Sequence, residues 1–413
     1  MAPAGDWAAL RAAIQAGAGS VYFGVGELNM RAKATNNFSA EDLPAIVDLC
    51  REHQVRPYLT LNTVLYDQDL PGMKELVDRA GAAGISAIIA SDQAAISYAY
   101  RQGIPVHIST QANISNIEMV EFYSHFADVM VLARELYLGQ VGEIVKAIKE
   151  RKITGPSGEL VKIEIFAHGA LCMAVSGKCY LSLHTYNTSA NRGACRQNCR
   201  HSYKVESDDG NELEIDNEFI MSPKDLCTID FLDDVLETGV SVLKIEGRGR
   251  SPEYVKMVTR CYREAAESVV NGSYTEEKVN EWKSNLAQVY NRGFWDGYYL
   301  GRRLGEWSDR RGSVATMKKL YAGDVLNYYA RPKVAHVELK AEDIREGDSI
   351  LIIGETTGVV EHNLESVWVD DRPVKHARKG EECTFPLPEK VRTGDKVYLR
   401  VKRGEGKELK TAD

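Results

Sequence analysis

The sequence lacks any apolar run of roughly 18 residues, the length that a helix needs to cross a bilayer. Its first residues, MAPAGDW, also lack the basic segment and apolar core of a secretory signal peptide. We therefore expect a cytoplasmic protein with no membrane partner. The net charge of −8 excludes indiscriminate coating of nucleic acid, although a local basic patch can still bind RNA.

Two motifs of hydrolytic enzymes are also missing. The chain contains neither the G-x-S-x-G turn of serine hydrolases nor the H-E-x-x-H helix of zinc peptidases. Peptidase chemistry would then need a cysteine nucleophile with a histidine such as His168 or His184. The sequence identifies no catalytic residue directly.

Cysteine is scarce, with eight residues in 413, but it is concentrated. Four of the eight lie within 28 residues, in the spacing C-x6-C-x15-C-x3-C: Cys172, Cys179, Cys195 and Cys199. Thiols this close together suit a disulfide framework, a zinc site or an iron–sulfur cluster. A reducing cytoplasm disfavours disulfides, so a metal site is the leading interpretation.

The spacing alone does not decide the metal. Zinc sites usually contain cysteine pairs separated by two to four residues, and only Cys195 and Cys199 fit that habit. Iron–sulfur clusters accept irregular spacings. Unliganded structural cysteines are a third interpretation. Cys227, 28 residues beyond Cys199, is an alternate ligand if the chain between them folds back.

Short apolar runs alternate with amphipathic helical patterns over residues 1–270, which is the rhythm of a βα protein. We predict an α/β fold with a TIM-like (β/α)8 barrel in this range, with an open doubly wound sheet as the alternative. The expected strands are residues 1–4, 21–24, 57–62, 87–91, 106–110, 129–133, 163–167 and 242–246.

The cysteines fall in an insertion, expected at 170–220, that begins at the C-terminal end of the 163–167 strand. Within it, residues 203–219 are polar and resemble a hairpin. Residues 271–311 are expected to form a helical connector. From residue 312 to 413 short alternating strands and turns predict a small all-β barrel domain.

Polar residues follow several predicted strands, at the rim where barrel enzymes carry out chemistry. Arginine and lysine there would grip a small carboxylate metabolite or an RNA phosphate. Alternatively, Arg134 with Glu135, and Lys244 with Glu246, form ion pairs that close the barrel. His168 is either a base or a hydrogen-bonding residue behind the site. The substrate-binding candidates are Gln111, Asn113, Arg134, Glu135, His168, Lys244, Glu246 and Arg248.

Basic residues are interleaved with Tyr and His around the cysteines, a composition that suits a flipped base stacked on aromatic rings with its phosphates held by arginine. A solvated loop with ordinary surface charges is the alternative. The RNA-binding candidates are Lys178, Arg192, Arg196 and Arg200, with Lys204 as a fifth basic residue.

Four segments, HGALCMAVSGKCYLS, SANRGACRQNCRHSY, MSPKDLC and VLKIEGRGRSPEYV, resemble the signature of the peptidase U32 family of collagenase-like proteases. The resemblance extends over most of the chain. Within the family the motifs look most like the tRNA hydroxylation protein P branch, whose members form 5-hydroxyuridine at the tRNA wobble position. Sister branches hydroxylate a ribosomal RNA cytidine or take part in ubiquinone hydroxylation.

The resemblance implies a 4Fe-4S cluster on Cys172, Cys179, Cys195 and Cys199, with Cys227 as the alternate fourth ligand. It also implies prephenate as co-substrate and tRNA, or alternatively ribosomal RNA, as the partner. We further expect the C-terminal β-barrel to help dock RNA, and a partner protein of the same family. The competing hypotheses are a collagenase-like peptidase and an RNA-binding module stabilised by zinc.

Overall fold

Eight parallel strands form a closed barrel, as the alternation of strand and helix patterns predicts. The computed structural model describes residues 1–33, 37–203, 219–301 and 305–404. The first seven barrel strands pair in the order in which they occur along the chain, and the seventh pairs with the eighth barrel strand as well. The ring closes because Ile245 donates a backbone hydrogen bond to Met1 (3.1 Å). The barrel strands are β1 (Ala2–Pro3), β2 (Ser20–Gly24), β3 (Arg56–Leu61), β4 (Ala87–Ala90), β5 (Val106–Ile108), β6 (Val129–Val131), β7 (Lys162–Ala170) and β9 (Val242–Ile245).

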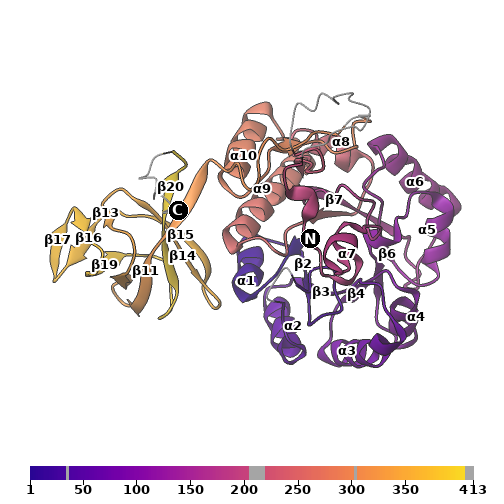
Figure 1. Cartoon of the computed structure of the whole chain (residues 1–413), viewed down its shortest axis with the longest axis horizontal. Coiled ribbons are helices and arrows are strands. Elements are labelled where there is room, and N and C mark those ends of the chain that lie inside the picture. Colours follow the sequence, from indigo (N-terminus) through magenta and orange to yellow (C-terminus); the bar gives the residue numbers. More distant parts are fainter. Residues whose placement is uncertain (34–36, 204–218, 302–304, 405–413) are drawn as a thin grey trace.

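Helices surround this barrel (Figure 1). Local sequence explains where some of them begin. Ser39 and Asp42 form a capping box, and Pro252 occupies the first turn of the longest helix. No helix in the described ranges is long and apolar enough to span a membrane. The helices are α1 (Trp7–Gln15), α2 (Leu43–Glu52), α3 (Leu70–Ala83), α4 (Gln93–Arg101), α5 (Ile117–Ser124), α6 (Leu138–Arg151), α8 (Leu232–Glu237) and α9 (Pro252–Val270), with 3-10 turns η1 (Ala40–Asp42), η2 (Asp67–Asp69) and η3 (Thr110–Ala112).

Two short strands extend the sheet beyond the eight strands of the barrel. β7 is nine residues long, and its last residues pair antiparallel with β8 (Asp225–Cys227). β10 (Phe294–Trp295) then pairs parallel with β8. The helix α10 (Glu276–Gln288) and β10 both contribute side chains to the main hydrophobic core, including Trp282 and Trp295. The part expected as a connector at 271–311 therefore belongs to the barrel's core at least as far as Tyr299.

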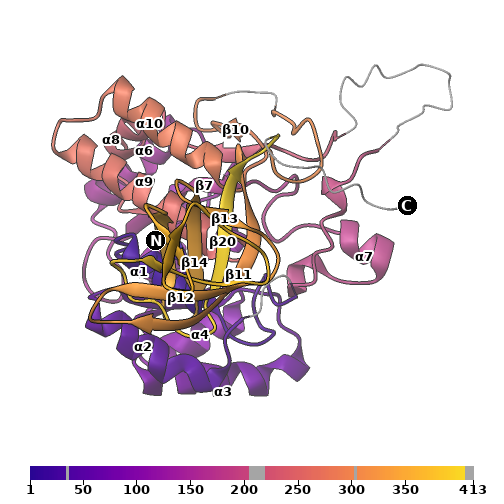
Figure 2. The same ribbon diagram turned by 90° about the vertical axis from the view of Figure 1, so that its left-hand side faces the viewer.

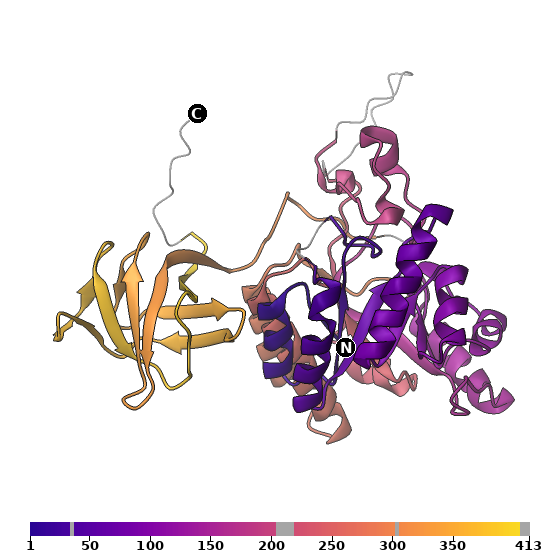
Figure 3. The same ribbon diagram turned by 90° about the horizontal axis from the view of Figure 1, so that it is seen from below.

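The cysteine-rich insertion projects from the C-terminal end of the barrel. Its helix α7 (Leu181–Tyr186) lies over the barrel axis in Figure 1, and Figure 3 shows the same segment rising from one end of the barrel. Two 3-10 turns, η4 (Ala190–Arg192) and η5 (Asn198–Arg200), complete the described part of it. The hairpin expected at 203–219 lies almost wholly outside the described residues, as does Lys204.

The C-terminal domain is an antiparallel β structure around its own core, as predicted. Its main sheet has eight strands in the order β15-β14-β20-β11-β12-β19-β16-β17, and β13 pairs with β18. The strands are β11 (Met317–Tyr329), β12 (Val334–Leu339), β13 (Ile344–Arg345), β14 (Ser349–Gly354), β15 (Gly358–Asn363), β16 (Val367–Val369), β17 (Arg372–Val374), β18 (His376–Ala377), β19 (Glu382–Pro386) and β20 (Lys396–Lys402).

This domain rests against α1 and α9 at the side of the barrel (Figure 2). Ala12 packs in one hydrophobic cluster with Leu351 and Val359. The side chain of Gln15 donates to Thr357 (2.8 Å) and accepts from the Val359 backbone (3.1 Å). Gly358 between them has a φ of 75°, and a Cβ there would lie 2.7 Å from the Gln15 amide oxygen. Only glycine fits this turn without displacing Gln15.

Candidate functional site

A cavity of about 250 Å³ lies between the C-terminal ends of the barrel strands and the insertion. All four clustered cysteines line it, although they come from different turns of the insertion: Cys172, Cys179, Cys195 and Cys199. Cys227 does not line it. The Cys227 thiol is buried on β8, where burial raises its pKa to about 11 and the Tyr262 hydroxyl donates to its sulfur (3.7 Å).

The four thiols share the cavity without converging on one point. Within the described chain, no three His, Cys, Asp or Glu side chains are placed to hold a single metal ion. The pKa values of Cys179 and Cys199 are raised by burial and also by the charges of the other cysteines. These thiols are therefore near one another, and a metal that binds them must displace their protons. One thiol per iron is an arrangement that a cluster can use.

Arg192 ties the insertion to the barrel. Its guanidinium donates to both carboxylate oxygens of Asp69 (2.6 and 3.2 Å) and to the Val64 carbonyl (3.0 Å). It also lies 4.0 Å from the centre of the Tyr66 ring. This sequence-predicted RNA residue is engaged in holding the cysteine segment in place.

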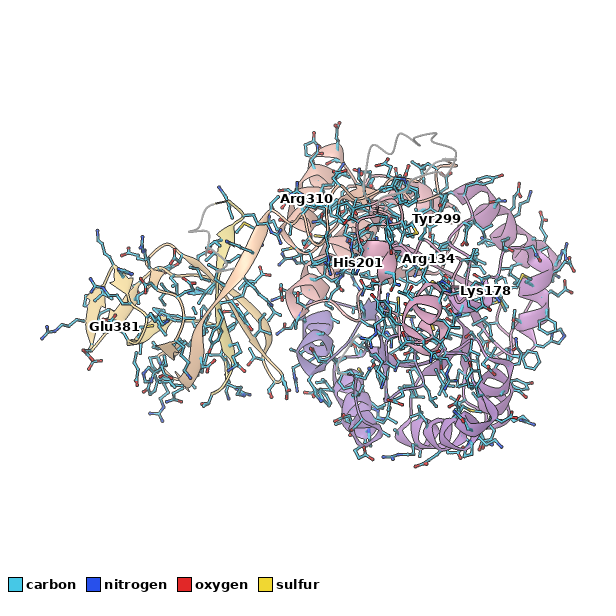
Figure 4. All side chains as sticks on the ribbon, in the orientation of Figure 1. Arg134, Lys178, His201, Tyr299, Arg310 and Glu381 are labelled. Carbon is cyan, nitrogen blue, oxygen red and sulfur yellow. The ribbon has the colours of Figure 1, made fainter. Side chains whose placement is uncertain are left out.

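Arg200 also holds the insertion in place, at a point further along the chain. Its guanidinium donates to Ser222 (3.1 Å), the Pro223 carbonyl (2.6 Å) and the Leu171 carbonyl. It lines the cavity from the side of the cysteines. Of the four RNA candidates, Lys178 and Arg196 have exposed side chains. Figure 4 shows Lys178 near the barrel axis.

Buried charges form the floor of the cavity at the end of β9. The Lys244 ammonium donates to Glu164 (2.7 Å), with side chains only 6% and 0% exposed, and lies 4.7 Å from the centre of the Tyr22 ring. Glu246 accepts from Arg31 (2.8 Å). Lys244 and Glu246 therefore pair with other residues, and the ion pair expected between them is wrong.

Glu246 is held ionised by its neighbours. Burial alone would raise the pKa of this carboxyl, but the charges of Arg31, Arg250 and Arg134 outweigh burial and lower the pKa to about 2. Arg248 next to it donates to Asn29 (3.0 Å) and Thr60 (2.8 Å). The floor thus presents one permanent anion among several cations.

Arg134 has a largely apolar setting. Its guanidinium lies 3.8 Å from the centre of the Phe166 ring and donates to the Ala170 carbonyl (3.1 Å), while its buried Nε has no hydrogen-bond partner within the described ranges. Glu135 is exposed, lies outside the cavity lining and forms no ion pair with Arg134 in the described chain. The second expected ion pair is also wrong.

Two amide side chains near the cysteines keep unused acceptors. Gln111 lines the cavity, and its buried Oε1 has no hydrogen-bond partner among the described residues. Asn113 lies behind the lining, where its Nδ2 donates to the Ser176 carbonyl (2.9 Å) and its buried Oδ1 has no partner in the part of the chain that the structure describes. Gln111 is thus able to accept a hydrogen bond from a ligand N–H or O–H group.

His168 lies in the core rather than in the cavity. It packs among Tyr254, Tyr262 and Phe294, and its Nδ1 lies 3.4 Å from the Tyr262 hydroxyl. Burial, aided by the charge of Arg250, lowers its pKa to about 3. A neutral, buried imidazole outside the lining is placed to support the barrel.

The cavity lining carries a strong excess of positive charge. Glu246 is its one acidic side chain in the described chain, although Glu164 and Asp225 pair with lining cations from behind. Arg134, Arg200 and Arg248 have no carboxylate partner among the described residues. The seven lining cations are Arg31, Arg134, Arg200, Lys244, Arg248, Arg250 and Arg292.

Arg250 and Arg292 were not among the candidates from sequence. Arg250 lies 3.7 Å from the centre of the Tyr290 ring, and Arg292 donates to Asp225 (3.2 Å). Arg250 lies two residues after Arg248, so its position after β9 could have identified it as a site candidate from the sequence. Arg292 reaches the site only because β10 pairs with β8, which no sequence pattern indicated.

The family model described as Peptidase family U32 matches residues 5–309, a range that contains both the barrel and the cysteine insertion. The chain belongs to peptidase family U32. This U32 chain is 55% identical over 406 residues to a relative named collagenase from Porphyromonas gingivalis, covering 98% of each chain.

Two other U32 relatives have names that describe RNA modification. A tRNA hydroxylation protein P from Helicobacter pylori is 31% identical, covering 73% of this chain and 71% of the relative. The 23S rRNA 5-hydroxycytidine C2501 synthase from Escherichia coli is 31% identical over 74% of this chain but 46% of its own length. The collagenase-named relative is more similar to this U32 chain than these two are.

Proposed function

We propose that this chain is an RNA-modifying enzyme of the cytoplasm, an iron–sulfur-dependent hydroxylase that forms 5-hydroxyuridine at the tRNA wobble position with prephenate as co-substrate. The observation that carries the proposal is the single cavity that combines four cysteine thiols with seven cationic side chains. Relatives named for tRNA and ribosomal RNA hydroxylation, each 31% identical, support the reaction class.

The four lining cysteines would hold a 4Fe-4S cluster, and Cys199 rather than Cys227 would be the fourth ligand because only Cys199 lines the cavity. A bound cluster would supply one-electron redox chemistry at the mouth of the barrel. A zinc ion needs its thiolates roughly 3.8 Å apart around one centre. No three of these thiols are placed around one such centre within the described chain.

The cations would bind and orient the carboxylate co-substrate. A guanidinium offers two parallel N–H donors that match a carboxylate, and hydrogen bonds in an enclosed, low-dielectric site are strong. Arg134 and Arg248 are the best placed because neither has a carboxylate partner among the described residues. Arg200 also lacks one, but both of its terminal nitrogens already donate to the chain. The free Oε1 of Gln111 would accept the N3–H of a uracil ring.

The peptidase alternative lacks a base beside the thiols. No histidine in the described chain lines the cavity, and His168 is buried behind it with a lowered pKa of about 3. A cysteine nucleophile requires a base within hydrogen-bond reach. The name of the collagenase relative is therefore not matched by a cysteine–histidine pair at this site.

The cluster assignment is tested by anaerobic purification followed by iron, sulfide and visible-absorption measurements. We expect iron and sulfide in the wild-type protein and their loss in Cys199→Ser. Cys227→Ser is the matched control, since it changes a buried thiol outside the cavity, and it should keep its iron. Iron loss in Cys227→Ser but not in Cys199→Ser would reverse the assignment.

The reaction is tested by mass spectrometry of nucleosides from tRNA and ribosomal RNA of a strain that lacks this gene. We expect 5-hydroxyuridine to disappear from tRNA in the deletion strain. Loss of a hydroxylated cytidine from ribosomal RNA instead would assign the other substrate. Unchanged nucleosides in both RNA classes, together with peptide hydrolysis by the purified protein, would favour the peptidase.

A further inference from the structure

A second hollow, of about 280 Å³, lies beside the cysteine cavity. Arg200 and Arg292 line both spaces, so the two are adjacent. The remaining walls come from the insertion and from the chain that leads to the C-terminal domain. The lining of the hollow consists of Arg196, Gln197, Arg200, His201, Ser222, Tyr290, Arg292, Arg311 and Gly312.

Positive charge dominates this hollow more completely than the first cavity. Four of its nine lining residues are arginine, and none is acidic. Arg196 and Arg311 are exposed, and no side-chain hydrogen bond or ion pair of either is found with a described residue. These two guanidinium groups keep their donors available for a ligand, whereas Arg292 is committed to Asp225.

The hollow lies on the way from the barrel mouth to the C-terminal domain. Figure 4 places His201 between Arg134, in the cysteine cavity, and Arg310, on the connecting chain. Figure 3 shows the chain running from the mouth of the barrel down to β11. Arg310 lines a further hollow together with Lys402 and Arg403 of the C-terminal domain.

We propose that this second hollow binds a backbone phosphate of the RNA strand whose base enters the cysteine cavity, with Arg196 and Arg311 as its ligands. The inference rests on the proposed function and extends it, because it fixes the direction in which the strand leaves the site. A phosphate carries the charge that Arg196, Arg200 and Arg311 attract, since the lining holds no acidic residue and Asp225 pairs with Arg292. The strand then continues along residues 305–312 toward the C-terminal domain.

Arg196 and Arg311 line the hollow from two different segments, one from the insertion and one from the connecting chain. A phosphate between them would join the two segments. Only some of the basic residues around the cysteines would then contact RNA, and they would do so at this hollow rather than across a broad surface patch. Arg192 and Arg200 hold the insertion. Of the two exposed candidates, Lys178 and Arg196, only Arg196 lines the hollow.

The test measures binding of a fluorescent tRNA anticodon stem-loop to the anaerobically purified full chain by anisotropy, over a series of salt concentrations. In the double variant Arg196→Gln/Arg311→Gln we expect affinity about tenfold lower at physiological salt, with the slope of log K against log salt reduced by about 0.7 to 0.9, because one phosphate contact is lost. Arg101→Gln is the matched control, since it removes an exposed charge at the end of α4.

Unchanged affinity and slope in the folded double variant would overturn the phosphate site, as would an equal loss in Arg101→Gln. If Arg196→Gln lowers the iron content, the single variant Arg311→Gln still tests the site, because Arg311 lies outside the insertion. Inorganic phosphate gives a further test. If it displaced RNA from the wild-type protein and from the double variant at the same concentrations, the result would also contradict the site. Nucleoside analysis separates the two proposals: RNA binding with the predicted dependence but no hydroxylated nucleoside would contradict only the proposed reaction.

Discussion

Arg134 and Glu135 are adjacent in sequence but have opposite environments. Arg134 packs on Phe166 inside the cavity, while Glu135 is exposed outside it. Both residues lie in the turn that follows β6, where no regular strand alternation fixes the direction of a side chain. Adjacency of opposite charges in sequence is therefore poor evidence for an ion pair at a barrel rim.

This contrast gives a matched pair of variants. We predict that Arg134→Gln raises KM for the carboxylate co-substrate about 10- to 100-fold, the value of a hydrogen bond to a charged group. Glu135→Gln should leave KM within about twofold, because surface changes have small effects. Steady-state kinetics of both variants decides; equal effects would show that the cavity does not bind the carboxylate through Arg134.

His168 predicts a pH dependence of stability. Its pKa is lowered to about 3 in the folded protein, so the unfolded chain takes up a proton below the ordinary histidine value of about 6.5 while the folded protein does not. Stability is therefore fully present above pH 6.5 and falls as the pH drops toward 3, by roughly 1.4 kcal/mol per unit at most. His168→Phe should have a shallower fall in denaturation midpoint between pH 7 and 5. An identical fall in both proteins would contradict this assignment.

Arg192 joins the insertion to the chain after β3 by three side-chain hydrogen bonds. We predict that Arg192→Ala lowers the iron content and speeds proteolysis within residues 172–200, because it removes charge-assisted hydrogen bonds worth about 1.5–3 kcal/mol. Arg196→Ala, whose side chain is exposed, should change neither quantity. The Tm of the barrel should stay nearly constant in both variants, as measured by circular dichroism. A normal iron content in Arg192→Ala would contradict the anchoring role.

The regular elements were predictable from sequence because each strand of the barrel is a short apolar run followed by an amphipathic helix. β10 was not, since it is two residues long and forms only by pairing with β8, which itself pairs with the part of β7 beyond the barrel. The cysteines were predictable as a group from their spacing. Their surroundings were only partly so, since Arg292 depends on the pairing of β10 with β8.

At the scale of the whole molecule, the barrel and the C-terminal domain meet through a small apolar contact at Ala12, which is fully buried against Leu351 and Val359. We predict that Ala12→Asp destabilises the protein by about 2–5 kcal/mol, because a buried carboxylate has no partner there. Arg11→Gln loses one exposed hydrogen bond to Glu355 and should cost less than about 1 kcal/mol. Thermal unfolding and small-angle scattering measure the two effects. A compact, equally stable Ala12→Asp protein would contradict this interface.

The overall charge of −8 gives no hint of the basic cavity and the basic hollow beside it. Positive charge is concentrated at one end of the barrel, where β strands, insertion and connecting chain meet. RNA would therefore approach this end and not the acidic remainder of the surface. Local arrangement, which only the folded chain provides, determines the electrostatics of the site.

The most direct measurement is nucleoside mass spectrometry of tRNA from a deletion strain that carries the wild-type gene, the Cys172→Ser variant or the Cys227→Ser variant. The account predicts that 5-hydroxyuridine returns with the wild-type and Cys227→Ser genes but not with Cys172→Ser, at equal protein levels. Full restoration by Cys172→Ser, or no loss of the nucleoside on deletion, would contradict the claim that this cavity hydroxylates RNA through its cysteines.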